Sequence, residues 1–104
     1  MLDSIRKCFL SDRALYTSHA KREMLGEEYG AITDSEVFEA IQEGEIIEDY
    51  PDDEPYPSVL LLGKTAQGRN IHVVCAYSGV DQLAIVITVY EPDPSRWING
   101  RRRR

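Results

Sequence analysis

After Gly44 the sequence changes from helical to strand-like patterns, and this change constrains the fold most. Runs rich in β-branched and other apolar residues occur near 45–50, 57–63, 70–78 and 83–90. A Pro- and Asp-rich corner, the segment KTAQGR and the short segment SGVDQ connect them. Connections this short join strands that run in opposite directions, because a parallel pair needs a longer crossover. The sequence therefore predicts an α+β fold with an antiparallel sheet of three to four strands.

The last two predicted strands belong at the centre of this sheet. Both of their alternating sets of side chains are largely apolar, as is typical of strands that are buried on two faces. We expect helices to cover one face. One of the two alternating sets contains four polar side chains, and we look for functional residues among them: His72, Ser78, Thr88 and Tyr90.

The clearest helix signal precedes the sheet. Thr33 and Glu36 have the N-cap and N3 spacing of a capping box, and Ile32 and Val37 have the spacing of a hydrophobic staple. These pairs predict a helix over 34–43.

Gly44 stands where a left-handed residue ends a helix. The apolar stripe of this helix consists of Val37, Phe38 and Ile41, which we expect to face the sheet. On this basis Phe38 is predicted to be a core residue.

Two further helices and a short strand are expected nearer the N-terminus. Apolar residues at helical spacing predict a helix over 2–11, and residues 14–17 are typical of a short edge strand. Ser18 is suited to be the N-cap of a helix over about 19–28. Both helices are available to cover the sheet.

The chain is long enough for one modest core and too short for two, so we expect a single domain over 1–97. Residues 1–95 carry seven Lys or Arg against eighteen Asp or Glu, whereas residues 96–104 carry five Arg and no acid. An acidic body disfavours nucleic acid unless basic groups gather on one face. We expect a flexible basic tail over 98–104, which either contacts RNA or a partner or is solvated.

No apolar run reaches the length of a signal-peptide core or a membrane span, so a cytoplasmic protein without membrane contact is expected. Cys8 and Cys75 are far apart and lack a CxxC or Cys/His cluster, so neither a disulfide nor a structural zinc site is expected. The seven carboxylates between Glu43 and Glu54 lack the regular ligand spacing of a calcium loop. We therefore expect no metal and no cofactor.

Four segments carry a resemblance to a known family. They are SHAKREM (18–24), IIEDYPDDEPYPS (46–58), GRNIHVVCAY (68–77) and ITVYEPDPSRW (87–97). Together they resemble a family of small, uncharacterised bacterial domains that are similar to BrnT-type toxins of the RelE/ParE superfamily. The resemblance implies a RelE/BrnT-like fold, a toxin that cleaves mRNA without a metal, and an antitoxin protein as partner.

Metal-independent RNA cleavage needs a base, an acid and cations that stabilise a charged transition state. His19 and His72 are suited to both proton transfers because the ordinary pKa of histidine is near neutrality. Tyr90 is the third catalytic candidate. For each, a structural role is the alternative: His19 as a capping residue, His72 as a half-buried strand residue and Tyr90 as a packing residue.

Lys64, Arg69 and Tyr77 are the RNA-binding candidates. The two cations flank the turn before the strand of His72 and are suited to holding a phosphate, and Tyr77 is suited to stacking on a base. The alternative for the cations is a solvated loop. Two functions stay open: a toxin-type endoribonuclease, or a non-catalytic module that binds another protein through its acidic corner or a sheet edge.

Overall fold

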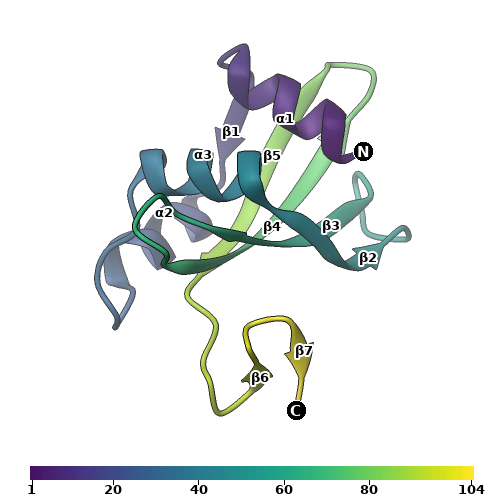
Figure 1. The fold of residues 1–104 in the computed structure, drawn as a ribbon. Coiled ribbons are helices and arrows are strands. Elements are labelled where there is room, and N and C mark those ends of the chain that lie inside the picture. The colour runs from purple at the N-terminus through teal and green to yellow at the C-terminus, as the bar shows by residue number, and fades with distance from the viewer.

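The computed structural model describes residues 1–104. It contains three helices, a five-stranded sheet and a separate two-stranded hairpin (Figure 1). In chain order the elements are α1 (Leu2–Leu10), β1 (Ala14–Tyr16), α2 (Ser18–Gly26), α3 (Asp34–Glu43), β2 (Glu45–Tyr50), β3 (Ser58–Lys64), β4 (Asn70–Ser78), β5 (Leu83–Tyr90), β6 (Trp97–Ile98) and β7 (Arg102–Arg103).

The sheet has the strand order β1-β5-β4-β3-β2. Strands β2 to β5 form the antiparallel meander that the short connections predict. The prediction of an antiparallel sheet of three to four strands is wrong in two respects. The strand β1 pairs with β5 in parallel, which makes the sheet mixed, and it brings the number of strands to five. The segment between β1 and β5 includes α2, α3 and three strands, so the direction of β1 is not fixed by a short turn.

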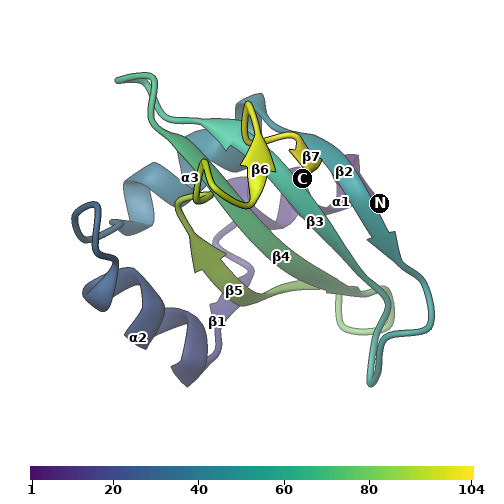
Figure 2. The same cartoon turned by 90° about the horizontal axis from the view of Figure 1, so that it is seen from below.

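All three helices cover one face of the sheet, and the hairpin β6–β7 lies against the other face (Figures 1 and 2). We call this second face the open face. The core lies between the helices and the sheet, where apolar side chains from both layers are removed from water. Its members include Ile5, Phe9, Ala20, Met24, Val37, Ile41, Val59, Leu61, Ile71, Val73, Val86 and Val89.

The predicted capping box of α3 is confirmed. The Glu36 amide donates to Thr33 Oγ1 at 3.1 Å, and the Thr33 amide donates to Glu36 Oε1 at 3.0 Å. Ile32 and Val37, the predicted staple, are both buried. The helix therefore begins where the sequence places it.

The buried stripe of α3 differs from the predicted one. Phe38 is 37% exposed, and Ala40 is buried in its place because the backbone of Gly63 lies directly against it. Gly44 has an extended backbone with φ −86° rather than a left-handed one. Its lack of a side chain is required by space, since a Cβ there would lie 2.5 Å from the Ala40 carbonyl oxygen.

Helix α2 begins one residue earlier than predicted, with Thr17 rather than Ser18 as its N-cap. Thr17 Oγ1 accepts from the Ala20 amide at 3.1 Å and donates to the Ile87 carbonyl at 3.2 Å. Thr17 thus caps the helix and ties it to β5, a role that depends on a strand far away in the sequence.

Where β5 extends past β1, its outer edge is covered by the carboxylates of Glu23 in α2 and of Glu27, the C-cap of that helix. Glu23 accepts from the Val89 amide at 3.0 Å, and Glu27 accepts from the Glu91 amide at 2.6 Å. Helix positions four apart lie on one side of a helix, which matches the two-residue repeat of amides along a strand edge. These amides are therefore paired without a further strand.

The C-terminal segment forms the hairpin β6–β7, in which Trp97 pairs with Arg103 and Ile98 with Arg102. The sequence predicts a flexible tail for most of this segment. The structure places it against the sheet, where Arg101 forms an ion pair with Glu45. Its flexibility stays a prediction. No helix of the chain combines the length and apolar character that crossing a bilayer requires.

Candidate functional site

His72 lies in the middle of the open face, under the hairpin. It is on β4 beside Tyr90 of β5, and its side chain is fully buried. The hairpin supplies the cover, because Gly100 and Trp97 lie directly against the imidazole ring. The strands therefore position His72, and the C-terminal segment removes it from solvent.

Both ring nitrogens of His72 have partners. Nδ1 lies 3.1 Å from the Tyr90 hydroxyl, and Nε2 lies 2.5 Å from the Gly100 carbonyl oxygen. A carbonyl only accepts, so Nε2 carries a proton here, and in the neutral ring Nδ1 accepts from Tyr90. Burial lowers the pKa of His72, which favours this neutral form.

Two aromatic rings pack edge-on against His72. The Tyr90 ring centroid lies 5.1 Å from that of His72, and the Trp97 centroid lies 4.5 Å away at an interplanar angle of 87°. Edge-on aromatic contacts of this kind hold a ring in one orientation. Arg103 then covers Trp97 from outside, with its guanidinium carbon 4.6 Å from the ring centroid.

Arg103 also joins the hairpin to β2. It donates to both carboxylate oxygens of Glu48, at 2.7 and 3.0 Å, and the Tyr50 hydroxyl donates to Glu48 Oε1 at 2.5 Å. The hydrogen bonds from Arg103 hold the pKa of Glu48 below its ordinary value. Burial and the bond to Glu48 raise the pKa of Tyr50 to about 12. Glu48 is therefore an ionised acceptor beside two donors.

We call these six residues the His72 cluster: His72, Tyr90, Trp97, Arg103, Glu48 and Tyr50. The cluster combines a neutral imidazole, an ionised carboxylate, two phenols and a guanidinium. These are groups of the kind that general acid–base catalysis uses. The chain contains no group of three or more His, Cys, Asp or Glu side chains arranged to hold a metal ion.

A polar cleft of about 810 Å³ adjoins the cluster. Lys64 lies in this cleft at the end of β3, and Asn70 is its partner on β4, two residues before His72. The hairpin contributes Asn99 and Arg101, and Glu43 and Glu45 are also in the lining. The predicted RNA-binding residue Lys64 is thus placed near His72, in surroundings that carry both charges.

His19 is placed away from the cluster. It lies in the first turn of α2 with an exposed side chain, and its Nε2 is 3.3 Å from Glu23. Glu23 in turn accepts from the Val89 amide on the strand edge. No polar contact joins His19 to His72, and the structure does not bring the two predicted histidines together.

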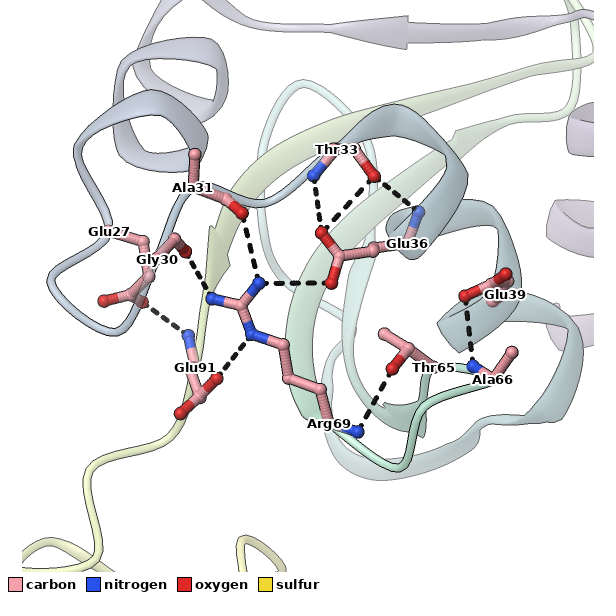
Figure 3. Close-up of polar contacts among 10 residues, drawn as sticks. All are labelled: Glu27, Gly30, Ala31, Thr33, Glu36, Glu39, Thr65, Ala66, Arg69 and Glu91. Carbon is pink, nitrogen blue, oxygen red and sulfur yellow. Dashed lines mark hydrogen bonds and ion pairs between the residues drawn. The ribbon is translucent and has the colours of Figure 1, made fainter.

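Arg69 connects three segments of the chain (Figure 3). Its Nε donates to Glu91 at 2.5 Å, Nη1 donates to Glu36 and to the Ala31 carbonyl at 3.1 Å each, and Nη2 donates to the Gly30 carbonyl. Burial lowers its pKa, but the hydrogen bonds that Arg69 donates to Glu91 and Glu36 outweigh this effect and raise it. Each guanidinium nitrogen is engaged within the chain, so we assign Arg69 a structural role.

Tyr77 lies on the other side of the sheet from His72. It is half-buried and packs against the core beneath the helices, next to a small cleft that includes Lys7 and Gln82. Strand alternation explains this placement, since residues 72 and 77 differ by an odd number. The structure therefore separates Tyr77 from the catalytic candidates.

Four members of the cluster were not candidates from the sequence: Glu48, Tyr50, Trp97 and Arg103. Glu48 stands among acids that are typical of a solvated corner, and Arg103 stands in a run of arginines that is typical of a tail. The one signal for their pairing is the opposite charge of these two segments, which does not specify which acid meets which arginine.

A family model described as "Domain of unknown function (DUF4258)" matches residues 16–91. The matched segment extends from the end of β1 to just past β5, so α1 and the hairpin lie outside it. No curated protein and no solved structure matches the chain.

Proposed function

Since the chain belongs to the DUF4258 family, whose description names no function, we propose one from the site: a metal-independent endoribonuclease of the toxin–antitoxin type that acts on mRNA. The observation that carries the proposal is the hydrogen-bonded His72–Tyr90 pair beside Glu48 on the open face. An antitoxin protein is the proposed partner. The resemblance of the sequence motifs to BrnT-type toxins supports the same proposal.

The proposed reaction is attack of the ribose 2′-oxygen on the adjacent phosphorus. Neutral His72 takes the 2′-hydroxyl proton, and Tyr90 donates a proton to the departing 5′-oxygen. His72 then returns its proton to Tyr90 through their 3.1 Å hydrogen bond. The P–O5′ bond breaks as the P–O2′ bond forms, which leaves a 2′,3′-cyclic phosphate and a 5′-hydroxyl.

The Tyr90 hydroxyl is suited to this exchange because it both donates and accepts hydrogen bonds. It therefore supports either neutral tautomer of His72, and Nε2 becomes the proton acceptor when Nδ1 carries the proton. A guanidinium such as that of Arg103 or an ammonium such as that of Lys64 would stabilise the charge on the phosphorus oxygens.

RNA reaches His72 only after the hairpin moves. The ion pairs that hold the hairpin to β2 have largely exposed arginines, and exposed pairs contribute about 0 to 1 kcal/mol each. The proposal therefore requires an open form in which Gly100 and Trp97 leave the imidazole.

Complete coverage of His72 is also the observation that favours the second candidate, a non-catalytic protein-interaction module. Both ring nitrogens are satisfied within the chain, as in a structural histidine. In this function the exposed acids Asp49 and Asp52 at the end of β2 would meet a basic partner segment.

The test is RNA cleavage by the purified chain with EDTA present. The expected products are a 2′,3′-cyclic phosphate or a 3′-phosphate. His72→Gln keeps a polar side chain of similar length but cannot relay a proton, so activity should fall at least about 100-fold. His19→Ala should leave cleavage unchanged, because His19 lies outside the cluster. Circular dichroism checks that both variants are folded.

Expression in a heterologous bacterium separates the two functions. If the wild-type chain neither arrests growth nor degrades RNA, and shows no RNA affinity at low salt, the nuclease proposal is refuted. If the chain is instead a protein-interaction module, the double variant Asp49→Asn/Asp52→Asn should no longer bind the partner protein. Asp53 is excluded from this variant because it accepts a hydrogen bond from buried Ser58 at 2.6 Å.

A further inference from the structure

The outer edge of β1 has backbone groups free to pair. The Ala84 amide donates to the Arg13 carbonyl at 3.1 Å, and the Thr17 amide donates to the Val86 carbonyl at 3.0 Å. Parallel pairing alternates along a strand, so the amides and carbonyls of Ala14 and Tyr16 point away from β5. Unpaired edge groups of this kind are a template for another strand.

An apolar groove of about 860 Å³ lies beside this edge, between β1, α2 and the segment that leads into α3. Met24 and Ile32 are buried beneath it. Leu15 and Leu25 also line it, and their side chains are 54% and 80% exposed. Two exposed leucines in one groove beside a free strand edge are typical of a protein-binding surface.

Two carboxylates mark the ends of the edge. Asp12 precedes β1, and Asp34 lies near its other end beside Tyr16, where burial together with the charge of Asp34 raises the pKa of Tyr16 to about 12. The chain as a whole carries a net charge of −6. A partner with a cation at each end therefore has complementary charge, and a second copy of this chain would meet like charges.

We propose that this edge and groove bind an extended peptide segment of a partner protein, apolar at alternate positions and with a Lys or Arg at each end. The segment adds to β1 as a further strand. Its backbone pairs with Ala14 and Tyr16, and its apolar side chains cover Leu15 and Leu25. The surface does not include the His72 cluster, so the inference holds whether or not the chain cleaves RNA.

A peptide-display selection tests the proposal. A library of random ten-residue peptides is selected on the immobilised full chain, and binders to the Leu15→Asp/Leu25→Asp double variant are removed. Both leucines are exposed, so the double variant should fold. Enriched peptides should have alternating apolar positions and basic ends, and they should bind the double variant at least about tenfold more weakly.

Val80→Asp is the matched control, because Val80 is 95% exposed in the turn before β5 and lies outside the groove. It should not change peptide affinity. Asp12→Asn should weaken binding and reduce its dependence on salt. On binding, hydrogen exchange should slow at the Ala14 and Tyr16 amides, which a peptide held by side chains alone would not protect.

Several results would overturn the proposal. They are a selection that yields no groove-dependent peptide, equal affinity for wild type and double variant, or protection confined to other amides. A concentration-dependent dimer that Leu15→Asp abolishes would assign the edge to a second copy, and would equally rule out the proposed occupant. Analytical ultracentrifugation of the chain without peptide shows whether such a dimer forms.

Discussion

At the scale of single residues, Arg69 joins segments that would otherwise be separate. It lies in the turn before β4 and donates to the loop after α2, to the capping residue Glu36 and to Glu91 after β5. The sequence shows that residue 69 is a cation, but it does not show which groups this cation binds. A guanidinium in a turn that also holds Thr65 and Gly68 is compatible with phosphate binding, and only the fold brings two carboxylates and two carbonyls around it.

Arg69→Ala should therefore lower stability rather than RNA affinity. The substitution leaves two carboxylates and two carbonyls without their donor, and we expect a loss of about 2 to 3 kcal/mol, allowing for partial exposure to solvent. Denaturant unfolding measures it. Arg102→Ala is the control, because Arg102 is exposed and should change stability by less than about 0.5 kcal/mol. Equal effects from both substitutions would contradict the structural role.

Phe38 and Ile41 provide a second prediction at this scale. Ile41 is fully buried against the sheet, so Ile41→Ala should cost about 2 to 5 kcal/mol. Phe38→Ala should cost clearly less than Ile41→Ala, because 37% of the Phe38 residue is already exposed. Denaturant unfolding of the two variants gives the comparison, and a larger loss at Phe38 would place that ring in the core instead.

At the scale of elements, the sequence predicts most of the molecule because the signals are local. The capping box defines the start of α3, and strand periodicity with short connections defines β2 to β5. Two elements could not be predicted in full. The direction of β1 depends on a pairing with distant β5, and the hairpin depends on contacts with Glu45 and Glu48 in an acidic corner.

The cap of α3 should respond to the hydroxyl of Thr33. Thr33→Ala removes the acceptor of the Glu36 amide and should destabilise the chain by about 1 kcal/mol, whereas Thr33→Ser keeps that acceptor and should be nearly neutral. Thermal and denaturant unfolding distinguish these outcomes. Equal losses in both variants would show that the threonine methyl, rather than the hydroxyl, is needed.

The hairpin should detach in acid. Burial lowers the pKa of His72 from 6.5, so its contribution is complete above this pH and is lost as the pH falls and the imidazole takes up a proton. Glu48, whose pKa is lowered from 4.5 chiefly by hydrogen bonds from Arg103, acts in the same direction below pH 4.5. Emission from Trp97, the only tryptophan, reports the change.

His72→Gln is the control for this titration. It removes the imidazole, so the change in Trp97 emission that depends on His72 taking up a proton below pH 6.5 should disappear, while the change that depends on Glu48 below pH 4.5 remains. Identical titrations of the wild type and the variant would mean that His72 does not govern the hairpin.

At the scale of the whole molecule, the chain consists of a sheet with helices on one face and the small hairpin β6–β7 on the other (Figure 2). The sequence predicts that His72 and Tyr90 share a face of the sheet. Alternation along β4 places His72 there, whereas in β5 a bulge between Val86 and Thr88 is also needed, because Ala84 and Val86 face the core. The sequence does not predict that Trp97 covers them, since a packing partner for an apolar face can come from any part of the chain. The candidate site was therefore predicted in β4 and β5 and missed in β2 and in the hairpin.

A chain ending at Glu91 should keep the fold. Nearly all of the buried core lies before this residue, and the family match ends there. The truncated chain should retain its circular dichroism spectrum, and it should bind the dye ANS more strongly because His72 and its apolar neighbours on the open face become accessible. Loss of cooperative unfolding would show instead that the hairpin is needed for folding.

The carboxylates of Glu23 and Glu27 have a consequence for self-association. A sheet edge with a long row of free amides can recruit identical chains one after another and grow into a fibril. Glu23 and Glu27 occupy the Val89 and Glu91 amides, so the stretch of β5 that extends past β1 offers no continuous row of donors to such a chain. Along this stretch of β5, the two carboxylates thus block pairing with an identical chain.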